Sequence, residues 1–281
     1  MHPHAEIPVA SPLSKQDINL ILRDNARLHH IVAETHSKIL WIEEPGKVGI
    51  SFQEPGASYP WFHYALRDRS KDGNKEGYNP QIDGIENEGA VEESTYWLDP
   101  RESIYHHYPS EIASFIHNPF EALPFENPTK KALEDWIMLW NEIVQLKDPP
   151  HPGQYALQKI PGLRRNILEN SLRVLREKNW QQLHAIPTWY HTQKLYNYLG
   201  YEYIHMADKA RVEMMQEKLS HVPEPYDSWI VMLQFWAELA EQNGVHPENY
   251  VPNAYILRDQ SNQIITYPLS PEKNLWMTLP I

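Results

Sequence analysis

Residues 154–206 decide the fold: QYALQKIPGLRRNILENSLRVLREKNWQQLHAIPTWYHTQKLYNYLGYEYIHM. A strand-like run over residues 155–160 meets a turn at Pro161 and Gly162, two residue types that favour turns. Leucines then recur at helical spacing, which predicts an amphipathic helix directly after the turn. The apolar face of this helix carries Leu168, Leu172 and Leu175. Four arginines are expected largely off that face: Arg164, Arg165, Arg173 and Arg176.

The second half of this stretch predicts one more helix between two strands. Asn179 suits the end of the first helix, because asparagine tolerates the left-handed conformation. Residues 182–186 predict a short strand, residues 189–199 a second helix, and residues 201–205 a further strand. Gly200 suits the position just after the second helix. The predicted order is therefore strand, glycine turn, helix, strand, helix, strand.

This order, closed by LYNYLGY over residues 195–201, resembles the C-terminal half of the GNAT family of N-acyltransferases. In that family, a glycine-rich turn after a central strand opens a helix, and backbone N–H groups hold the diphosphate of coenzyme A. A helix N-terminus suits this task because its free donors and its dipole favour an anion. The turn of the family, [QR]-x-x-G-x-[GA], corresponds here to Lys159, Gly162 and Arg164. Arg164 stands where the family has a small residue.

The resemblance implies a cofactor site and a set of catalytic residues. The cofactor site would comprise Lys159, Ile160, Gly162, Leu163, Arg164 and Arg165. Tyr196 occupies the position of the tyrosine that often protonates the leaving thiolate in the family. An ammonium substrate also requires a base, for which Glu202 on the following strand and His184 on the preceding strand are the candidates.

The patterns along the whole chain predict an α+β fold, mostly helical, with a small mixed sheet, peripheral β-hairpins and a GNAT-like C-terminal half. A mainly helical region is expected over residues 1–148, with a hairpin at 38–53 and a long polar loop at 67–94. Residues 149–281 would form an αβ region that contains the unit 154–206 and ends in a helix and a hairpin. Because no flexible linker marks the boundary, one single domain is the alternative.

Three expectations concern individual elements. One amphipathic helix starts at Ser14, and its apolar face continues to residue 32. The adjacent carboxylates Glu92 and Glu93 are interpreted as solvated rather than catalytic. Residues 255–257 and 264–267 suggest a terminal hairpin.

The composition limits the classes of function. The 281 residues contain 37 acidic and 25 basic side chains, which argues against a broad surface for nucleic acid or anionic membranes. With no cysteine, the chain can form neither a disulfide nor a thiol nucleophile, as is usual in cytoplasmic proteins. The sequence lacks an apolar run of about 20 residues and a basic, apolar N-terminal signal, so we expect neither a membrane span nor secretion.

The favoured interpretation is an acyl-coenzyme A-dependent N-acyltransferase, active or degenerate, that acts on a small-molecule or peptide amine. An alternative is a non-catalytic adaptor that binds a protein partner. The adaptor hypothesis rests on residues 226–242, which predict a helix that is apolar nearly all round and that is either buried or a partner surface.

A helical metalloprotein is the third hypothesis. His30 and Glu34 are four residues apart and would share a helical face. The full set of candidate ligands is His29, His30, Glu34 and His36 with His106 or His107. Because no matching pair of ligands is evident elsewhere, a solvated helix face is the favoured interpretation, and no metal is expected.

Overall fold

The computed structural model describes residues 9–71, 89–97, 100–119, 129–156, 160–270 and 273–281. Within these residues the fold is α+β, with eight α-helices and a seven-stranded mixed sheet. The helices are α1 (Lys15–Leu22), α2 (Ala26–Glu34), α3 (Ser110–His117), α4 (Lys130–Gln145), α5 (Leu163–Glu177), α6 (Tyr190–Tyr198), α7 (Met206–Lys218) and α8 (Tyr226–Gln242). None of these helices combines the length and the apolar character needed to cross a membrane.

The main sheet runs in the order β1-β2-β3-β4-β5-β9-β6. Its strands are β1 (Lys38–Glu44), β2 (Lys47–Gln53), β3 (Phe62–Asp68), β4 (Ala90–Trp97), β5 (Gln182–Ala185), β6 (Glu202–Tyr203) and β9 (Met277–Pro280). A separate pair is formed by β7 (Leu269–Ser270) and β8 (Lys273–Asn274). Every contact between neighbouring strands of the main sheet is antiparallel except the one between β4 and β5, which is parallel.

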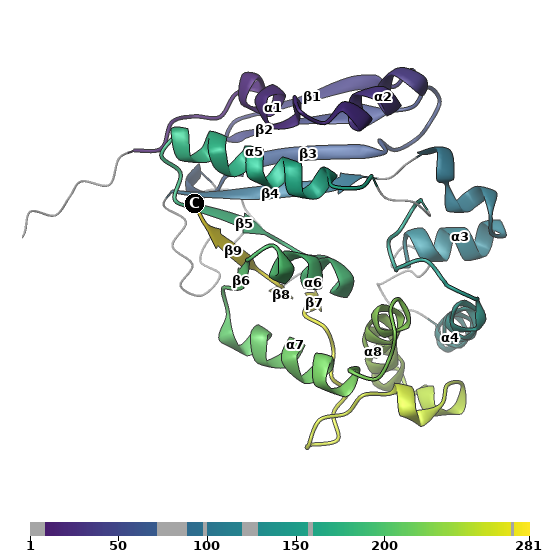
Figure 1. Cartoon of the computed structure of the whole chain (residues 1–281). Coiled ribbons are helices and arrows are strands. Elements are labelled where there is room, and N and C mark those ends of the chain that lie inside the picture. The colour runs from purple at the N-terminus through teal and green to yellow at the C-terminus, as the bar shows by residue number, and fades with distance from the viewer. Residues whose placement is uncertain (1–8, 72–88, 98–99, 120–128, 157–159, 271–272) are drawn as a thin grey trace, which may run out of the picture.

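One face of the sheet is covered by α1, α2 and α5, which lie in front of β1–β4 in Figure 1. The inward side chains alternate along each strand, as the pleat requires. On β3 they are Phe62, Tyr64 and Leu66. The Tyr64 hydroxyl lies 2.7 Å from Ser171 Oγ on α5, so this helix is joined to the sheet by a buried polar contact as well as by packing.

A second hydrophobic core lies beside the sheet, among α3, α4, α7 and α8. It is built on tryptophans: Trp136 and Trp236 have ring centroids 4.2 Å apart. Trp140 donates its indole N–H to the Trp229 carbonyl over 3.0 Å, and Trp229 donates to the Pro150 carbonyl over 2.7 Å. The satisfied donors of Trp140 and Trp229 allow these two rings to be buried at little polar cost.

Several expected elements are confirmed. The hairpin at 38–53 is β1 and β2, and the helix expected at 226–242 is α8. The helices α5 and α6 and the strand β5 lie where the sequence predicts them. Asn179 and Gly200 both have positive φ, at 63° and 92°, as expected for residues that end helices.

Other expectations are wrong. The helix predicted from Ser14 is two helices, because the chain turns over Arg23–Asn25. Residues 90–94 belong to β4 rather than to a polar loop, and residues 72–88 lie outside the described part. The predicted terminal hairpin is only an isolated bridge between Arg258 and Ile264, whereas the unpredicted β9 inserts between β5 and β6.

The strand expected at 155–160 is also wrong. Its described residues form one isolated bridge, from Ala156 to Ser103, and residues 157–159 lie outside the described part. The central strand next to α5 is β4 instead. The main sheet therefore takes strands from both of the regions predicted from the sequence, and residues 1–148 contain the four strands β1–β4 as well as the helices α1–α4.

Candidate functional site

β4 and β5 are paired along only half of β4. Residues Ala90–Glu93 lie beside Gln182–Ala185, and β4 then continues to Trp97 without β5. β5 ends at Ala185, and Pro187 follows two residues later with no backbone N–H to donate. The free half of β4 therefore borders a split in the sheet.

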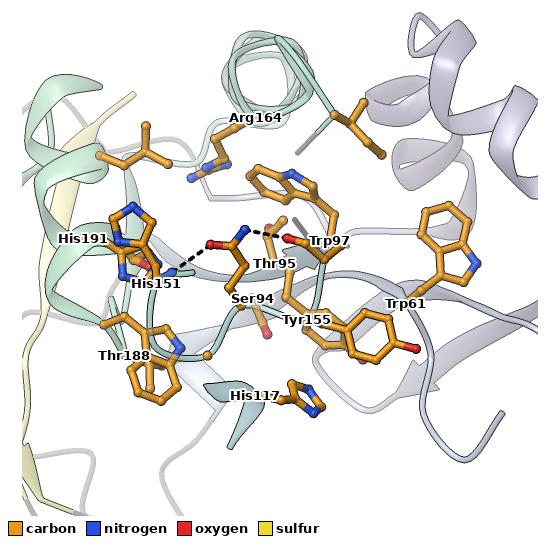
Figure 2. Close-up of a pocket in the computed structure, with 18 of the residues that line it drawn as sticks. Trp61, Ser94, Thr95, Trp97, His117, His151, Tyr155, Arg164, Thr188 and His191 are labelled. Carbon is orange, nitrogen blue, oxygen red and sulfur yellow. Dashed lines mark hydrogen bonds between the residues drawn. The ribbon is translucent and has the colours of Figure 1, made fainter. Parts of the chain in front are cut away.

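A cavity of about 1930 Å³ opens at this split (Figure 2). Its wall is formed by the end of β4, the first residues of α5, the cavity-facing side of α6, and segments around α3 and the β2–β3 loop. The cavity is large enough for an extended ligand, since pockets for drug-sized ligands usually measure about 300–1,000 Å³.

The N-terminus of α5 faces this cavity. Gly162, the residue before the helix, has φ 73°, and a Cβ built there would meet no atom within 4 Å. Among the described residues, the backbone amides of Arg164 and Arg165 have no hydrogen-bond acceptor, whereas the Asn166 amide donates to the Gly162 carbonyl over 3.0 Å. Two backbone donors at the start of the helix are therefore left without an acceptor within the described residues. Ile160, Gly162, Arg164 and Arg165 line the cavity, whereas Leu163 is buried in the core.

Arg164 and Glu93 form a buried ion pair at the split. Their nearest atoms, Arg164 Nη2 and Glu93 Oε1, are 2.6 Å apart, and the two side chains are 7% and 0% exposed. Arg164 also stacks on the Tyr196 ring, 5.0 Å from its centroid, and donates to the Tyr201 hydroxyl over 3.3 Å. The expectations that Arg164 lies off the buried face and that Glu93 is solvated are wrong, because each charge supplies the partner that permits the other to be buried.

The ion pair leaves polar atoms unsatisfied. Within the described residues, Glu93 Oε2, Arg164 Nη1 and Thr95 Oγ1 are buried without a hydrogen-bond partner. Buried polar atoms are normally paired, so an unpaired group in a native structure requires a reason such as a bound water or a ligand. These three atoms belong to residues around the open end of β4, which is where the cavity meets the sheet.

Tyr196 lies on α6, against the ion pair and along the cavity wall. Its ring packs edge-on to Tyr201, with centroids 4.8 Å apart, and its exposed fraction is 5%. Burial raises the pKa of the phenol to about 12, and the nearby Glu93 carboxylate raises it as well, against the lowering effect of Arg164. The phenol is therefore protonated at neutral pH, the form that a proton donor requires.

Neither expected base is next to Tyr196. His184 on β5 pairs with Glu92 and Thr278, and Glu202 on β6 also pairs with Thr278, so both side chains lie on the sheet face opposite Glu93. Glu202 is exposed, and neither residue is among those that line the cavity. Burial, with a smaller contribution from the Arg69 charge, lowers the pKa of His184 to about 4.

Two histidines that the sequence did not single out line the cavity together. His151 follows α4, and His191 belongs to the first turn of α6, and their ring centroids are 4.4 Å apart. Figure 2 shows both residues beside Thr188, on one side of the end of β4. The turn that carries His151 is fixed by Gln154, which accepts from the His151 amide and donates to the Ala156 carbonyl. Forty residues separate the two histidines, so no local pattern signals the pair.

The other candidate residues lie elsewhere. Lys159 is outside the described residues. His30 Nε2 and Glu34 Oε1 are 2.9 Å apart on α2, and Glu34 also binds Arg101. The described residues contain no group of three or more His, Asp or Glu side chains arranged to hold a metal ion.

The helix α8, proposed as a partner surface, is part of the second core. Eleven of its seventeen residues are buried, among them Trp229, Leu233 and Trp236. Its apolar side chains pack inside the molecule, which accounts for the apolar character that runs nearly all round it.

The site thus combines a split sheet, an open helix N-terminus, a buried Glu93–Arg164 pair, a buried tyrosine and two paired histidines around one cavity. No protein-family model matches this chain, and searches of curated proteins and of solved structures found no match either.

Proposed function

We propose that the protein is an N-acyltransferase that uses an acyl-coenzyme A to acylate an amine. The observation that carries this proposal is the split between β4 and β5, with the open N-terminus of α5 at its mouth. A split of this kind leaves a slot for the extended pantetheine arm, whose amides can pair with the strand edge that β5 leaves free. The GNAT resemblance of residues 154–206 supports the same assignment.

The diphosphate of the cofactor would bind at the start of α5. The free amides of Arg164 and Arg165 supply two hydrogen bonds, and the helix dipole adds a favourable field. The exposed guanidinium of Arg165 adds a charge and is held 3.2 Å from the Tyr198 hydroxyl. Arg164 serves differently from the small residue of the family. Its side chain turns inward to Glu93, away from the position that the diphosphate would occupy.

In the proposed acyl transfer, Tyr196 is placed to protonate the departing sulfur. The neutral amine nitrogen attacks the thioester carbonyl carbon, forming the C–N bond, and the C–S bond then breaks. The Tyr196 phenol donates a proton to the departing sulfur, and solvent later restores that proton. The products are an amide and free coenzyme A.

The proton that the amine loses requires an acceptor in the cavity. The His151–His191 pair supplies one, because both rings line the cavity and imidazole accepts protons near neutral pH. This pair takes the role for which the sequence suggested Glu202 or His184. A His191→Gln variant should lose about 10²-fold in kcat, as expected for the loss of a general base.

A direct assay tests the proposal. The full chain is incubated with acetyl-coenzyme A and a panel of primary amines, and free thiol is measured. Tyr196→Phe should lower kcat by about 10²-fold, as expected for the loss of a general acid. Tyr255→Phe is the matched control, since Tyr255 is 36% exposed and packs on Trp140 outside the cavity. Absence of any thermal shift with millimolar coenzyme A, together with equal turnover of the two variants, contradicts the proposal.

A further inference from the structure

The lysine and arginine side chains that line the cavity all lie at one of its ends. The cations among its described lining residues are Arg164, Arg165 and Lys194, which all belong to α5 or α6. The opposite end, lined by the β2–β3 loop, α3 and the segment before Ala156, contributes no lysine or arginine among the described residues. The carboxylate of Glu54 lies at that end. Arg164 is paired with Glu93, and Lys194 is paired with Glu224. An anion near α5 therefore relies on Arg165 and the α5 amides, whereas a cation is favoured at the far end.

The same far end is aromatic. Tyr105 on η3 (Ile104–His106), His117 on α3 and Tyr155 form a cluster, with ring centroids 5.3–6.2 Å apart. The Tyr105 hydroxyl lies 3.4 Å from His117 Nδ1. In Figure 2, Tyr155 and Trp61 lie on the side of the β4 end away from His151 and His191. Three separate segments thus bring rings to one wall.

Three tyrosine rings at this end of the molecule are open to the cavity. Tyr105 is 41% exposed, Tyr96 on β4 is 40% exposed and Tyr59 in the β2–β3 loop is 70% exposed. All three line the cavity. Large aromatic side chains gathered at the mouth of a cavity are a frequent feature of ligand sites, whereas single exposed rings are ordinary.

We propose that this aromatic end is the acceptor subsite and that the acceptor is a primary amine carried on an aromatic ring. The ring would pack against Tyr105 and Tyr155 in the offset or edge-on geometries that aromatic pairs prefer. The ammonium would lie toward tyrosine faces and the Glu54 carboxylate, which attract a cation. That the bound amine is then acylated rests on the proposed function, whereas its binding does not.

In this arrangement the two ligands would occupy separate ends of the cavity. The diphosphate is held by amides and cations at the start of α5, and the amine by rings and a carboxylate at the other end. The reactive ends of both ligands then meet along the free half of β4, between the two subsites.

Binding is tested first, by calorimetric titration of the full chain without cofactor. The probes are 2-phenylethylamine, 2-cyclohexylethylamine and 2-phenylethanol, which differ by the ring faces or by the charge. The phenyl amine should bind at least about 5-fold more tightly than either analogue, from the ring and cation contributions together. Equal affinity for the phenyl and cyclohexyl amines, or no binding of the phenyl amine at 10 mM, overturns the inference.

Variants locate the subsite. Tyr155→Leu and Tyr105→Leu should each weaken binding of 2-phenylethylamine about 5-fold and leave the thermal shift caused by coenzyme A unchanged. Tyr255→Leu is the control, because Tyr255 is 36% exposed and packs on Trp140 outside the cavity. Unchanged amine affinity in both cavity variants contradicts the assignment.

Failure of the acceptor subsite and failure of the acyltransferase proposal give different results. If coenzyme A binds and the amine series shows no preference, the acceptor subsite is wrong and the acyltransferase proposal stands. If the phenyl amine binds with the expected preference, but coenzyme A gives no thermal shift and Tyr196→Phe turns over as fast as its control, the aromatic site stands and the acyltransferase proposal is wrong.

Discussion

The two halves of β4 differ in their surroundings although they belong to one strand. Ala90, Val91 and Glu93 are buried in the half that pairs with both β3 and β5, whereas Ser94 and Tyr96 are exposed in the half that pairs with β3 alone. The paired half supports the core, and the free half offers its edge to the cavity. Glu93 is the last residue of β4 that pairs with both β3 and β5, and its carboxylate lies in the proposed site.

The largest effect is expected at this junction. Arg164→Ala leaves the Glu93 carboxylate buried without its cation, which should lower the free energy of unfolding by about 3–5 kcal/mol. Urea denaturation measures this loss. Arg165→Ala is the control, because its side chain is exposed and should change stability by no more than about 0.5 kcal/mol. Similar losses in the two variants would show that the pair does not hold the junction together.

Acid should weaken the sheet beside both halves of β4, at His184 next to the paired half and at His63 next to the free half. The pKa of His184 is lowered from its ordinary value of 6.5 to about 4, as is that of His63, where burial and then the Lys47 charge are the causes. The unfolded chain binds more protons between pH 6.5 and 4, so the stability present above pH 6.5 is lost as the pH falls through this range.

Unfolding at pH 7 and at pH 4.5 tests this dependence. A His63→Gln/His184→Gln double variant should show a smaller loss of stability on acidification, by the order of 2 kcal/mol. His221→Gln, at an exposed position, should keep the slope of the parent protein. A double variant as acid-sensitive as the parent would contradict the assignment of neutral, buried histidines.

Two glycines beside the cavity have nearly the same φ angle but differ in the room available for a Cβ atom. Gly162 and Gly153 have φ of 73° and 74°, so alanine is strained at both. At Gly162 a Cβ meets nothing within 4 Å, whereas at Gly153 it would lie 2.3 Å from Cε2 of Trp189. Gly162→Ala should cost about 1 kcal/mol, and Gly153→Ala about 1–3 kcal/mol more. Equal costs in thermal unfolding would mean that the start of α5 is not open.

Much of the fold follows from local pattern. The amphipathic period of α5, the residues that end α5 and α6, and the alternation of β1 and β2 are all readable from the sequence. β4 was missed because its inward face carries Glu93 and Thr95, and polar residues at buried positions break the alternation on which strand prediction depends. β9 was missed because it is short and its partners β5 and β6 precede it by more than 70 residues.

The site was predictable only in part. The turn at Gly162 and the tyrosine at 196 were located from the sequence, since both belong to a contiguous stretch. The Glu93–Arg164 pair and the His151–His191 pair join residues 71 and 40 positions apart, so only the tertiary fold brings each pair together. The bases expected from the sequence, Glu202 and His184, lie on the sheet face opposite Glu93. Their face could not be foreseen, because strand membership does not reveal it until the register is known.

The central claim is that the amides at the start of α5 receive the diphosphate of coenzyme A. Titrating ¹⁵N-labelled protein with coenzyme A, while following the amide resonances of Arg164 and Arg165, tests it most directly. We expect both resonances to move in a saturable way, with those of α8 unchanged. Resonances of Arg164 and Arg165 that stay fixed at millimolar coenzyme A would contradict the account.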